Sequence, residues 1–251
     1  MYKVLVSDPL ADKGIAILKD AGFEVIYNPN PSNDELQMYS RDINAWVVRS
    51  GTKIVAEYLH GASNLQVIGR AGVGVDNIDI KAATNEGIIV MNMPDGNIIS
   101  AAEHTIAMMM SLSRNIHLGH LGILEGEWNR SNLVGSELNG KILGVVGLGR
   151  VGREVIKRAI GLEMNIMGYD PFVSADVIDK EKINIVDLDD LTQKADYITL
   201  HVPFLDTTKD LFDAKRLSMM KKTARIINVA RGGVINETDL GNALNEEIIA
   251  G

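Results

Sequence analysis

The sequence predicts an α/β protein with two doubly wound domains, each built on a parallel β-sheet. One observation is the regular alternation of short apolar runs with helix-forming segments over the first third of the chain. Another is a second series of the same kind, which begins at Lys141. The third is the length of 251 residues, which suffices for two domains of ordinary size. Repeated strand–helix units form parallel sheets that helices cover on both faces.

The first series of elements extends to about residue 94. Its apolar runs predict strands over residues 3–7, 24–27, 45–48, 66–69 and 88–91. Helices are expected over residues 10–21, 54–60 and 78–86. A further short helix is expected after Ser32, because Ser32 and Glu35 have the spacing of a capping box.

The second series follows a loop that contains Pro94, Gly96 and Asn97. The pattern first predicts one long helix over residues 98–124, whose three consecutive methionines indicate core or subunit-interface packing. Later apolar runs predict strands over residues 142–146, 165–169, 197–201 and 225–229. A helix capped by Asn236 and Asp239 follows. Residues 248–251 resemble the start of a further strand, so we expect the sequence to end inside a domain.

A glycine turn lies between the strand expected at 142–146 and a helix expected at 153–160. In this spacing the first glycine permits a tight turn and the second lets the backbone approach a pyrophosphate. The third lets helix and strand pack closely, and the helix N-terminus offers N–H groups to phosphates. The sequence therefore predicts a dinucleotide site that contains Gly147, Gly149, Arg150, Val151 and Gly152.

Asp170 ends the next expected strand and indicates which dinucleotide is bound. A carboxylate at this position accepts hydrogen bonds from a ribose 2′-hydroxyl and repels a 2′-phosphate, so NAD is favoured over NADP. The next residue is Pro171, and no arginine lies nearby to receive a phosphate. The alternative is that Asp170 only caps the end of the strand.

Composition excludes several classes of function. The net charge of −8 argues against nucleic acid as the main partner. Without cysteine there is no disulfide, thiol nucleophile or cysteine metal site, and the five histidines lack metal-ligand spacing. The N-terminal segment is a strand rather than a signal peptide, and the apolar stretches are far shorter than the roughly 20 residues that span a bilayer. We expect a cytoplasmic protein that binds neither membranes nor metals.

Longer motifs resemble the D-isomer-specific 2-hydroxyacid dehydrogenase family. They include Val-Arg-Ser-Gly-Thr at 48–52, Gly-Arg-Ala-Gly-Val-Gly-Val-Asp-Asn-Ile at 69–78 and Asn-Val-Ala-Arg-Gly-Gly at 228–233. Further similar segments occur in the order of the family, at residues 91–94, 96–97, 100–105, 126–128, 137–141 and 144–171. The resemblance thus covers nearly the whole chain.

The resemblance implies a substrate domain, an NAD-binding domain and an active site in the cleft between them. Residues 1–94 are similar to the N-terminal part of the substrate domain, which is flavodoxin-like. Residues 95–251 are similar to a Rossmann NAD-binding domain that lacks its last strands. The resemblance also implies a homodimer or a higher homo-oligomer.

Arg231 is the candidate catalytic residue. It follows the strand expected at 225–229 and so lies at the carboxyl edge of the sheet, where ligands bind in open α/β folds. A guanidinium can hold the substrate carboxylate bidentately and polarise the oxygen at C2. Arg231 matches the family's catalytic arginine. The alternative is a surface arginine in a glycine-rich turn.

Several residues are candidates for binding a small anionic substrate. The segment from Ala71 to Gly74 could expose successive backbone N–H groups as an anion-binding nest, unless it is a plain turn. Arg49 and Arg70 each end a strand at the carboxyl edge, where they could instead form salt bridges. Asn97 lies at the hinge, and Arg130 could act across a dimer. The substrate-binding candidates are therefore Arg49, Arg70, Gly72, Val73, Gly74, Asn97 and Arg130.

The resemblance extends the cofactor site to the ends of two later strands. The implied additional contacts are His201, Val202, Pro203, Val229, Ala230 and Arg231. The family's catalytic base is a histidine paired with a glutamate, both C-terminal to the Arg231 motif, and neither has a match up to Gly251. His104 and His201 lie outside that motif, so we expect these 251 residues to bind NAD but to turn over poorly.

The arginines favour a phosphorylated 2-hydroxy acid as the substrate of an NAD-dependent dehydrogenase. Two alternatives remain open. One is a related reductase of glyoxylate or hydroxypyruvate. The other is a non-catalytic scaffold that senses NAD, because such scaffolds also keep the motifs of the family.

Overall fold

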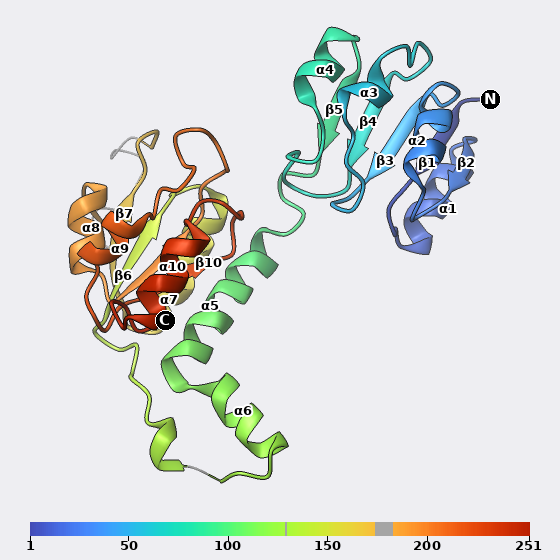
Figure 1. Ribbon diagram of the computed structural model, residues 1–251. Coiled ribbons are helices and arrows are strands. Elements are labelled where there is room, and N and C mark those ends of the chain that lie inside the picture. Colours follow the sequence, from blue (N-terminus) through green and yellow to red (C-terminus); the bar gives the residue numbers. More distant parts are fainter. Residues whose placement is uncertain (129, 174–182) are drawn as a thin grey trace. The chain divides into compact units, whose positions relative to one another are not determined.

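The computed structural model describes residues 1–128, 130–173 and 183–251. The chain divides into two compact units, Met1–Asn97 (unit 1) and Ile98–Gly251 (unit 2), which are coloured blue to green and green to red in Figure 1. The division falls close to the boundary that the sequence places after residue 94.

Unit 1 is built on a parallel sheet with the strand order β2-β1-β3-β4-β5. The strands are β1 (Lys3–Val6), β2 (Glu24–Tyr27), β3 (Ala45–Val48), β4 (Val67–Arg70) and β5 (Ile89–Asn92). The helices are α1 (Asp12–Asp20), α2 (Asn33–Ser40), α3 (Ala56–Leu59) and α4 (Ile80–Asn85). This strand order is the flavodoxin-like order, as predicted. Its core is centred on the fully buried Trp46, Leu59 and Ile68.

Unit 2 contains a second parallel sheet with the order β10-β9-β6-β7-β8. The strands are β6 (Ile142–Val146), β7 (Asn165–Tyr169), β8 (Asn184–Ile185), β9 (Tyr197–Leu200) and β10 (Arg225–Asn228). The helices are α5 (Ile98–Arg114), α6 (Ile116–Leu124), α7 (Arg150–Gly161), α8 (Leu188–Lys194), α9 (Ala214–Met219) and α10 (Glu237–Asn245), with a 3₁₀ turn, η1, at Arg130–Leu133. The two doubly wound sheets confirm the predicted fold class.

The expected continuous helix over residues 98–124 is wrong, because the structure breaks it at Asn115. Asn115 adopts a left-handed conformation with φ 53°, which asparagine tolerates better than most residues. The last turn of α5 bonds to another segment instead: the Ser136 N–H donates to the Ser113 carbonyl at 2.9 Å. The Asn115 amide donates to the Val134 carbonyl at 3.2 Å, and α6 starts in a new direction after this turn (Figure 1).

Besides η1, three short elements of unit 2 are not anticipated by the sequence patterns. They are β8, α8 and α9, and both helices begin at an aspartate whose side chain accepts a backbone N–H, Asp187 before α8 and Asp213 before α9. These N-caps are the sequence signals that could have located the helices. At the end of the chain, Ala250 N–H donates to the Ala224 carbonyl, and Ile226 N–H donates to the Gly251 carbonyl, both at 2.9 Å. Residues 250–251 therefore pair alongside β10.

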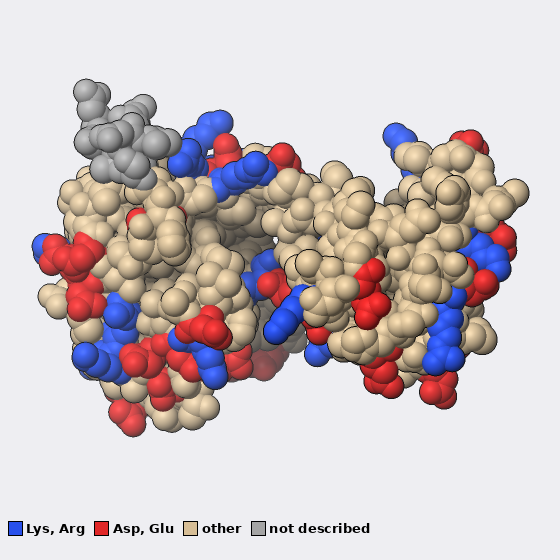
Figure 2. Space-filling model, turned by 90° about the horizontal axis from the view of Figure 1, so that it is seen from above, with Lys and Arg blue, Asp and Glu red and all other residues tan. Residues whose placement is uncertain are grey.

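Acidic and basic side chains are interspersed on the face shown in Figure 2. Within the described residues, every helix is too short or too polar to traverse a bilayer. In the same part of the chain, no three His, Cys, Asp or Glu side chains gather as a metal ion would require.

Candidate cofactor and substrate sites

In the glycine turn after β6, the surroundings of each of the three glycines differ and explain separately why a residue without a side chain is found there. Gly147 has φ +96°, and a Cβ there would lie 2.6 Å from the His201 carbonyl oxygen. A Cβ on Gly152 would collide with the Gly147 carbonyl oxygen, so the helix packs tightly onto the turn. Gly149, in contrast, has open space at its Cβ position and caps α7 in an extended conformation. The open side of Gly149 is where a pyrophosphate could approach the backbone.

Asp170 follows β7 and is fixed against the glycine turn. One carboxylate oxygen accepts the Leu148 N–H and the other accepts the Phe172 N–H, each at 2.9 Å. The first bond spans the turn, so the carboxylate does more than cap its own strand. Its role toward a ribose hydroxyl remains a prediction.

The loop after β9 lies beside the glycine turn, because β6 and β9 are neighbours at the point where the strand order reverses. Ligands bind at such switch points in open α/β sheets. His201 begins this loop, and its Nε2 lies 3.0 Å from the Thr199 hydroxyl. Burial lowers the pKa of His201 to about 4, because desolvation penalises the charged imidazolium. The side chain is therefore neutral at physiological pH.

Arg231 follows β10 in a turn that Asn228 organises. The Asn228 side chain donates to the Arg231 carbonyl at 2.8 Å and accepts the Ala230 N–H at 3.0 Å. The Arg231 guanidinium also donates to the Ala230 carbonyl at 2.8 Å. The structure thus places Arg231 at the carboxyl edge of the sheet, as the sequence predicts, and it adds Asn228 as a positioning residue that the sequence patterns do not single out.

In unit 1, a buried carboxylate accepts hydrogen bonds from the loop that carries Arg49. Asp8 is only 3% exposed and accepts the Arg49 N–H at 2.5 Å and the Thr52 N–H at 2.9 Å. The Thr52 hydroxyl donates to the same carboxylate at 3.0 Å, and Asn77 donates to the Arg49 and Thr52 carbonyls at 2.9 and 2.7 Å. This loop lies at the β1–β3 switch point, and neither Asp8 nor Asn77 was anticipated.

The expected anion-binding nest in unit 1 is only partly available. Ala71 N–H donates to the Val48 carbonyl, and Gly72 N–H donates to the Arg70 carbonyl, both at 2.8 Å. The prediction that residues 71 and 72 expose successive donors is therefore wrong, because the Ala71 N–H continues the pairing with β3 and the Gly72 N–H closes a tight turn onto Arg70. A Cβ on Gly72 would collide with the Arg70 guanidinium, so these two candidates lie in contact. The Val73 carbonyl accepts the Asn92 amide at 2.6 Å.

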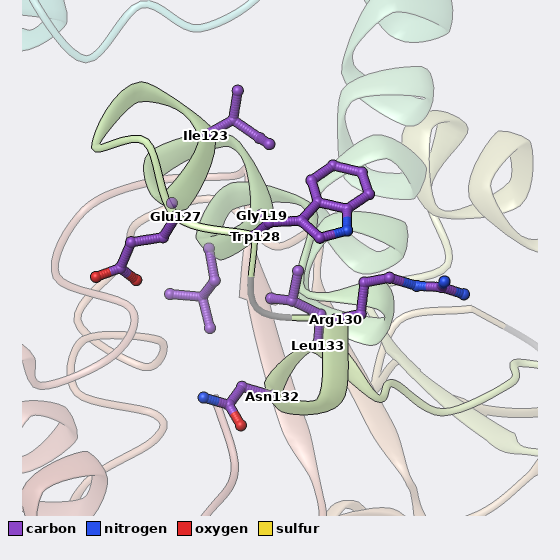
Figure 3. A pocket seen from close by; sticks show the side chains of 9 residues that line it. Gly119, Ile123, Glu127, Trp128, Arg130, Asn132 and Leu133 are labelled. Carbon is purple, nitrogen blue, oxygen red and sulfur yellow. The ribbon is translucent and has the colours of Figure 1, made fainter.

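Arg130 lies apart from the glycine turn, in η1. It lines a cavity of about 370 Å³ formed by α6, η1 and the segment between them. Figure 3 shows the Trp128 ring and the Arg130 guanidinium extending to one side of this cavity, and Glu127 and Asn132 to the other. None of the lining residues comes from the loops after β6, β9 or β10. Asn97 is the last residue of unit 1.

Comparison with known proteins identifies the class to which this fold and site belong. Residues 106–251 match the NAD binding domain of the D-isomer specific 2-hydroxyacid dehydrogenases. The chain therefore belongs to the D-isomer specific 2-hydroxyacid dehydrogenase family, and NAD is its cofactor. The glycine turn and Asp170 are compatible with this dinucleotide, because Gly149 leaves space beside the backbone and a carboxylate lies against the turn.

Individual relatives are similar over the whole chain. D-3-phosphoglycerate dehydrogenase of Methanocaldococcus jannaschii is 46% identical over 98% of this chain, and that of Homo sapiens is 43% identical over 100%. This chain spans 47% of the length of each. Among solved structures, NAD-dependent formate dehydrogenase from Staphylococcus aureus in complex with NAD has a TM-score of 0.89 and 30% identity, with 100% of this chain and 80% of that chain covered.

Proposed function

We propose that this protein oxidises 3-phosphoglycerate to 3-phosphohydroxypyruvate with NAD, the first step of serine biosynthesis. The observation that carries the proposal is the position of Arg231 at the same sheet edge as the glycine turn and Asp170. A guanidinium there is suited to hold a substrate carboxylate beside a bound dinucleotide. The names of the relatives that are 43% and 46% identical support the choice of substrate.

Each candidate side chain has a separate task in this reaction. Bound NAD supplies the acceptor for the hydride that leaves C2. Arg231 pairs with the carboxylate and polarises the oxygen at C2, while Arg49 and Arg70 provide cations for the phosphate. The neutral imidazole of His201 and the backbone of residues 202–203 and 229–230 contact the cofactor.

We infer that the base that removes the hydroxyl proton is not among residues 1–251. The resemblance implies a glutamate–histidine pair after the Arg231 motif, and loss of a general base costs about 10²–10⁴-fold in rate. We therefore expect a polypeptide limited to these 251 residues to bind NADH and to reduce phosphohydroxypyruvate slowly. Turnover by this polypeptide at an ordinary rate, on the order of 1–10³ per second, would contradict this assignment.

Substrate preference tests the proposal against its alternatives. A protein that combines these residues with the implied glutamate–histidine pair should reduce phosphohydroxypyruvate with NADH faster than hydroxypyruvate or glyoxylate. Preference for the unphosphorylated acids would identify a related reductase instead. NADH binding without turnover on any of them would identify a non-catalytic scaffold. Replacement Arg231→Ala should lower kcat/KM by at least roughly 10²-fold, whereas Lys222→Ala, which removes an exposed ion pair with Glu247, should not.

The cofactor preference is tested by titration. Asp170 should make NADH bind more tightly than NADPH, because its carboxylate repels a 2′-phosphate. Fluorescence titration of both nucleotides measures this preference directly. Tighter binding of NADPH would overturn the role proposed for Asp170.

We also propose that the protein is a homodimer. Five apolar residues of α6 are exposed, from 49% for Leu118 to 70% for Leu124, and no residue of this helix is buried within the chain. An apolar helix surface of this kind is typical of a subunit interface. A second copy could also bring its Arg130 to the substrate.

A further inference from the structure

Arg153, in the first turn of α7, bonds to the backbone on both sides of Gly149. Its side-chain Nε donates to the Leu148 carbonyl at 2.9 Å. Its own backbone N–H donates to the Gly149 carbonyl at 3.0 Å. One residue therefore fixes two consecutive carbonyl groups of the glycine turn.

Fixing these carbonyls also fixes the direction of the N–H groups that follow them. A trans peptide is planar, so its C=O and N–H bonds point in opposite directions, and the described residues contain no cis peptide. The bond from Arg153 to the Leu148 carbonyl thus aims the Gly149 N–H away from Arg153. On the preceding peptide, the Leu148 N–H is held by Asp170 at 2.9 Å. Leu148 is clamped through both its N–H and its C=O.

Favourable electrostatics does not explain why an arginine lies in the first turn of α7. A helix N-terminus carries the positive end of the helix dipole, which disfavours a cation in the first turn. The hydrogen bond to Leu148 gives the side chain a reason to be there despite this cost. The space that a Cβ on Gly149 would occupy is open, so a ligand can approach the backbone at this residue.

We propose that Arg153 is a positioning residue for the cofactor: its hydrogen bond to Leu148 aims the Gly149 N–H at the pyrophosphate of NAD. The proposal rests on the NAD site of the proposed function and is independent of the substrate. The glycine pattern by itself explains only why the backbone can approach the pyrophosphate. In this proposal the side chain of Arg153 sets the direction of the Gly149 N–H.

Two replacements separate the hydrogen bond from the charge. Arg153→Met keeps an unbranched side chain but removes the donor. Arg153→Gln keeps an N–H donor, because its Nε2 is as many bonds from Cα as the Nε of arginine, and it removes the charge. The matched control is Arg158→Met on the same helix, where the guanidinium bonds to Glu154 and Glu103 instead.

The experiment measures binding of NADH, ADP-ribose and adenosine to the 251-residue chain. Loss of one hydrogen bond should weaken NADH and ADP-ribose binding to Arg153→Met roughly three- to tenfold and leave adenosine, which has no pyrophosphate, unchanged. Arg153→Gln and Arg158→Met should bind all three ligands as the parent chain does. Thermal unfolding of each variant confirms that unit 2 is folded.

Each other outcome would overturn the proposal. Parent-like NADH binding by Arg153→Met would show that the hydrogen bond does not matter. Equal weakening in the Met and Gln variants would show that the charge contacts phosphate directly. Weakened adenosine binding would indicate general damage to the site. A parent chain that binds no NADH would contradict the cofactor site itself.

Discussion

The three glycines of the turn impose different demands on the protein, although they form one sequence pattern. Gly152 is required by the fold, because its Cα faces the Gly147 carbonyl with no space for a side chain. Gly149 is not required by the fold, because the space beside it is open. The two positions therefore separate stability from cofactor binding.

We predict that alanine at position 152 lowers the stability of unit 2, whereas alanine at position 149 weakens NADH binding. Gly152→Ala should lower the free energy of unfolding of unit 2 by about 1–3 kcal/mol, because the added methyl group overpacks the turn. Gly149→Ala should change it by less than about 0.5 kcal/mol but weaken NADH binding about tenfold or more. Urea unfolding and NADH titration measure the two effects. Gly161→Ala, where a Cβ also meets open space at the end of α7, is the control. Equal NADH affinity in Gly149→Ala and the parent would contradict the role of the open side.

His201 makes the stability of unit 2 depend on pH. Its folded-state pKa of about 4 lies below the ordinary value of 6.5, so between these values the unfolded chain binds a proton that the folded chain does not. Stability is therefore full above pH 6.5 and falls as the pH drops towards 4. Between pH 7 and pH 5 the loss should be about 2 kcal/mol.

Urea unfolding of His201→Asn at pH 7 and pH 5 tests this. The variant should lose this part of the pH dependence, because asparagine does not titrate. His104→Asn is the control, since His104 is exposed on α5 and water reaches it in both states. A pH dependence of His201→Asn equal to that of the parent would show that other groups cause it.

At the scale of single elements, the helix termini are determined locally. Ser32 accepts the Glu35 N–H at 3.3 Å, and the Glu35 carboxylate accepts the Ser32 N–H at 2.8 Å, which completes the predicted capping box of α2. These bonds lie within four residues of sequence, so the pattern alone suffices to find them.

Removal of this cap should destabilise unit 1. We expect Ser32→Ala to lower its free energy of unfolding by about 1 kcal/mol, since an orphan N–H of the first turn loses its acceptor. Chemical denaturation followed by the fluorescence of Trp46, the buried tryptophan of unit 1, measures the change. Ser63→Ala, in an exposed turn of the same unit, should have little effect. A loss no larger than that of Ser63→Ala would show that solvent replaces the cap.

Elements that depend on distant partners behave differently. The sequence pattern continues without interruption from α5 into α6, but the helix ends where residues 134–136 bond to the last turn of α5. Similarly, the Arg49 loop depends on Asp8, which is 44 residues away from Thr52 in sequence. Neither contact has a local periodicity that could predict it.

At the scale of the whole molecule, the exposed surface of α6 leads to the dimer prediction. Sedimentation at micromolar concentration should show a dimer, and Leu121→Glu should dissociate it, because a charge at a buried apolar interface is costly. Ile17→Glu on α1 is the matched control, since Ile17 is 59% and Leu121 52% exposed. NADH binding to both variants should persist. A parent chain that sediments as a monomer while binding NADH would contradict the dimer and the cross-subunit role of Arg130.

The sequence by itself determined the two parallel sheets, most strands to within a residue or two, the glycine turn and the position of Arg231. These features depend on periodicity and on short-range backbone demands, which a single sequence displays. Only the tertiary structure decided which donors and acceptors meet. It placed Asp170 against Leu148, used the N–H groups of residues 71 and 72 within unit 1, and joined Arg153 to the turn. Such contacts depend on how side chains and loops converge after the strands have paired. The hydrophobic pattern of the sequence does not predict this convergence.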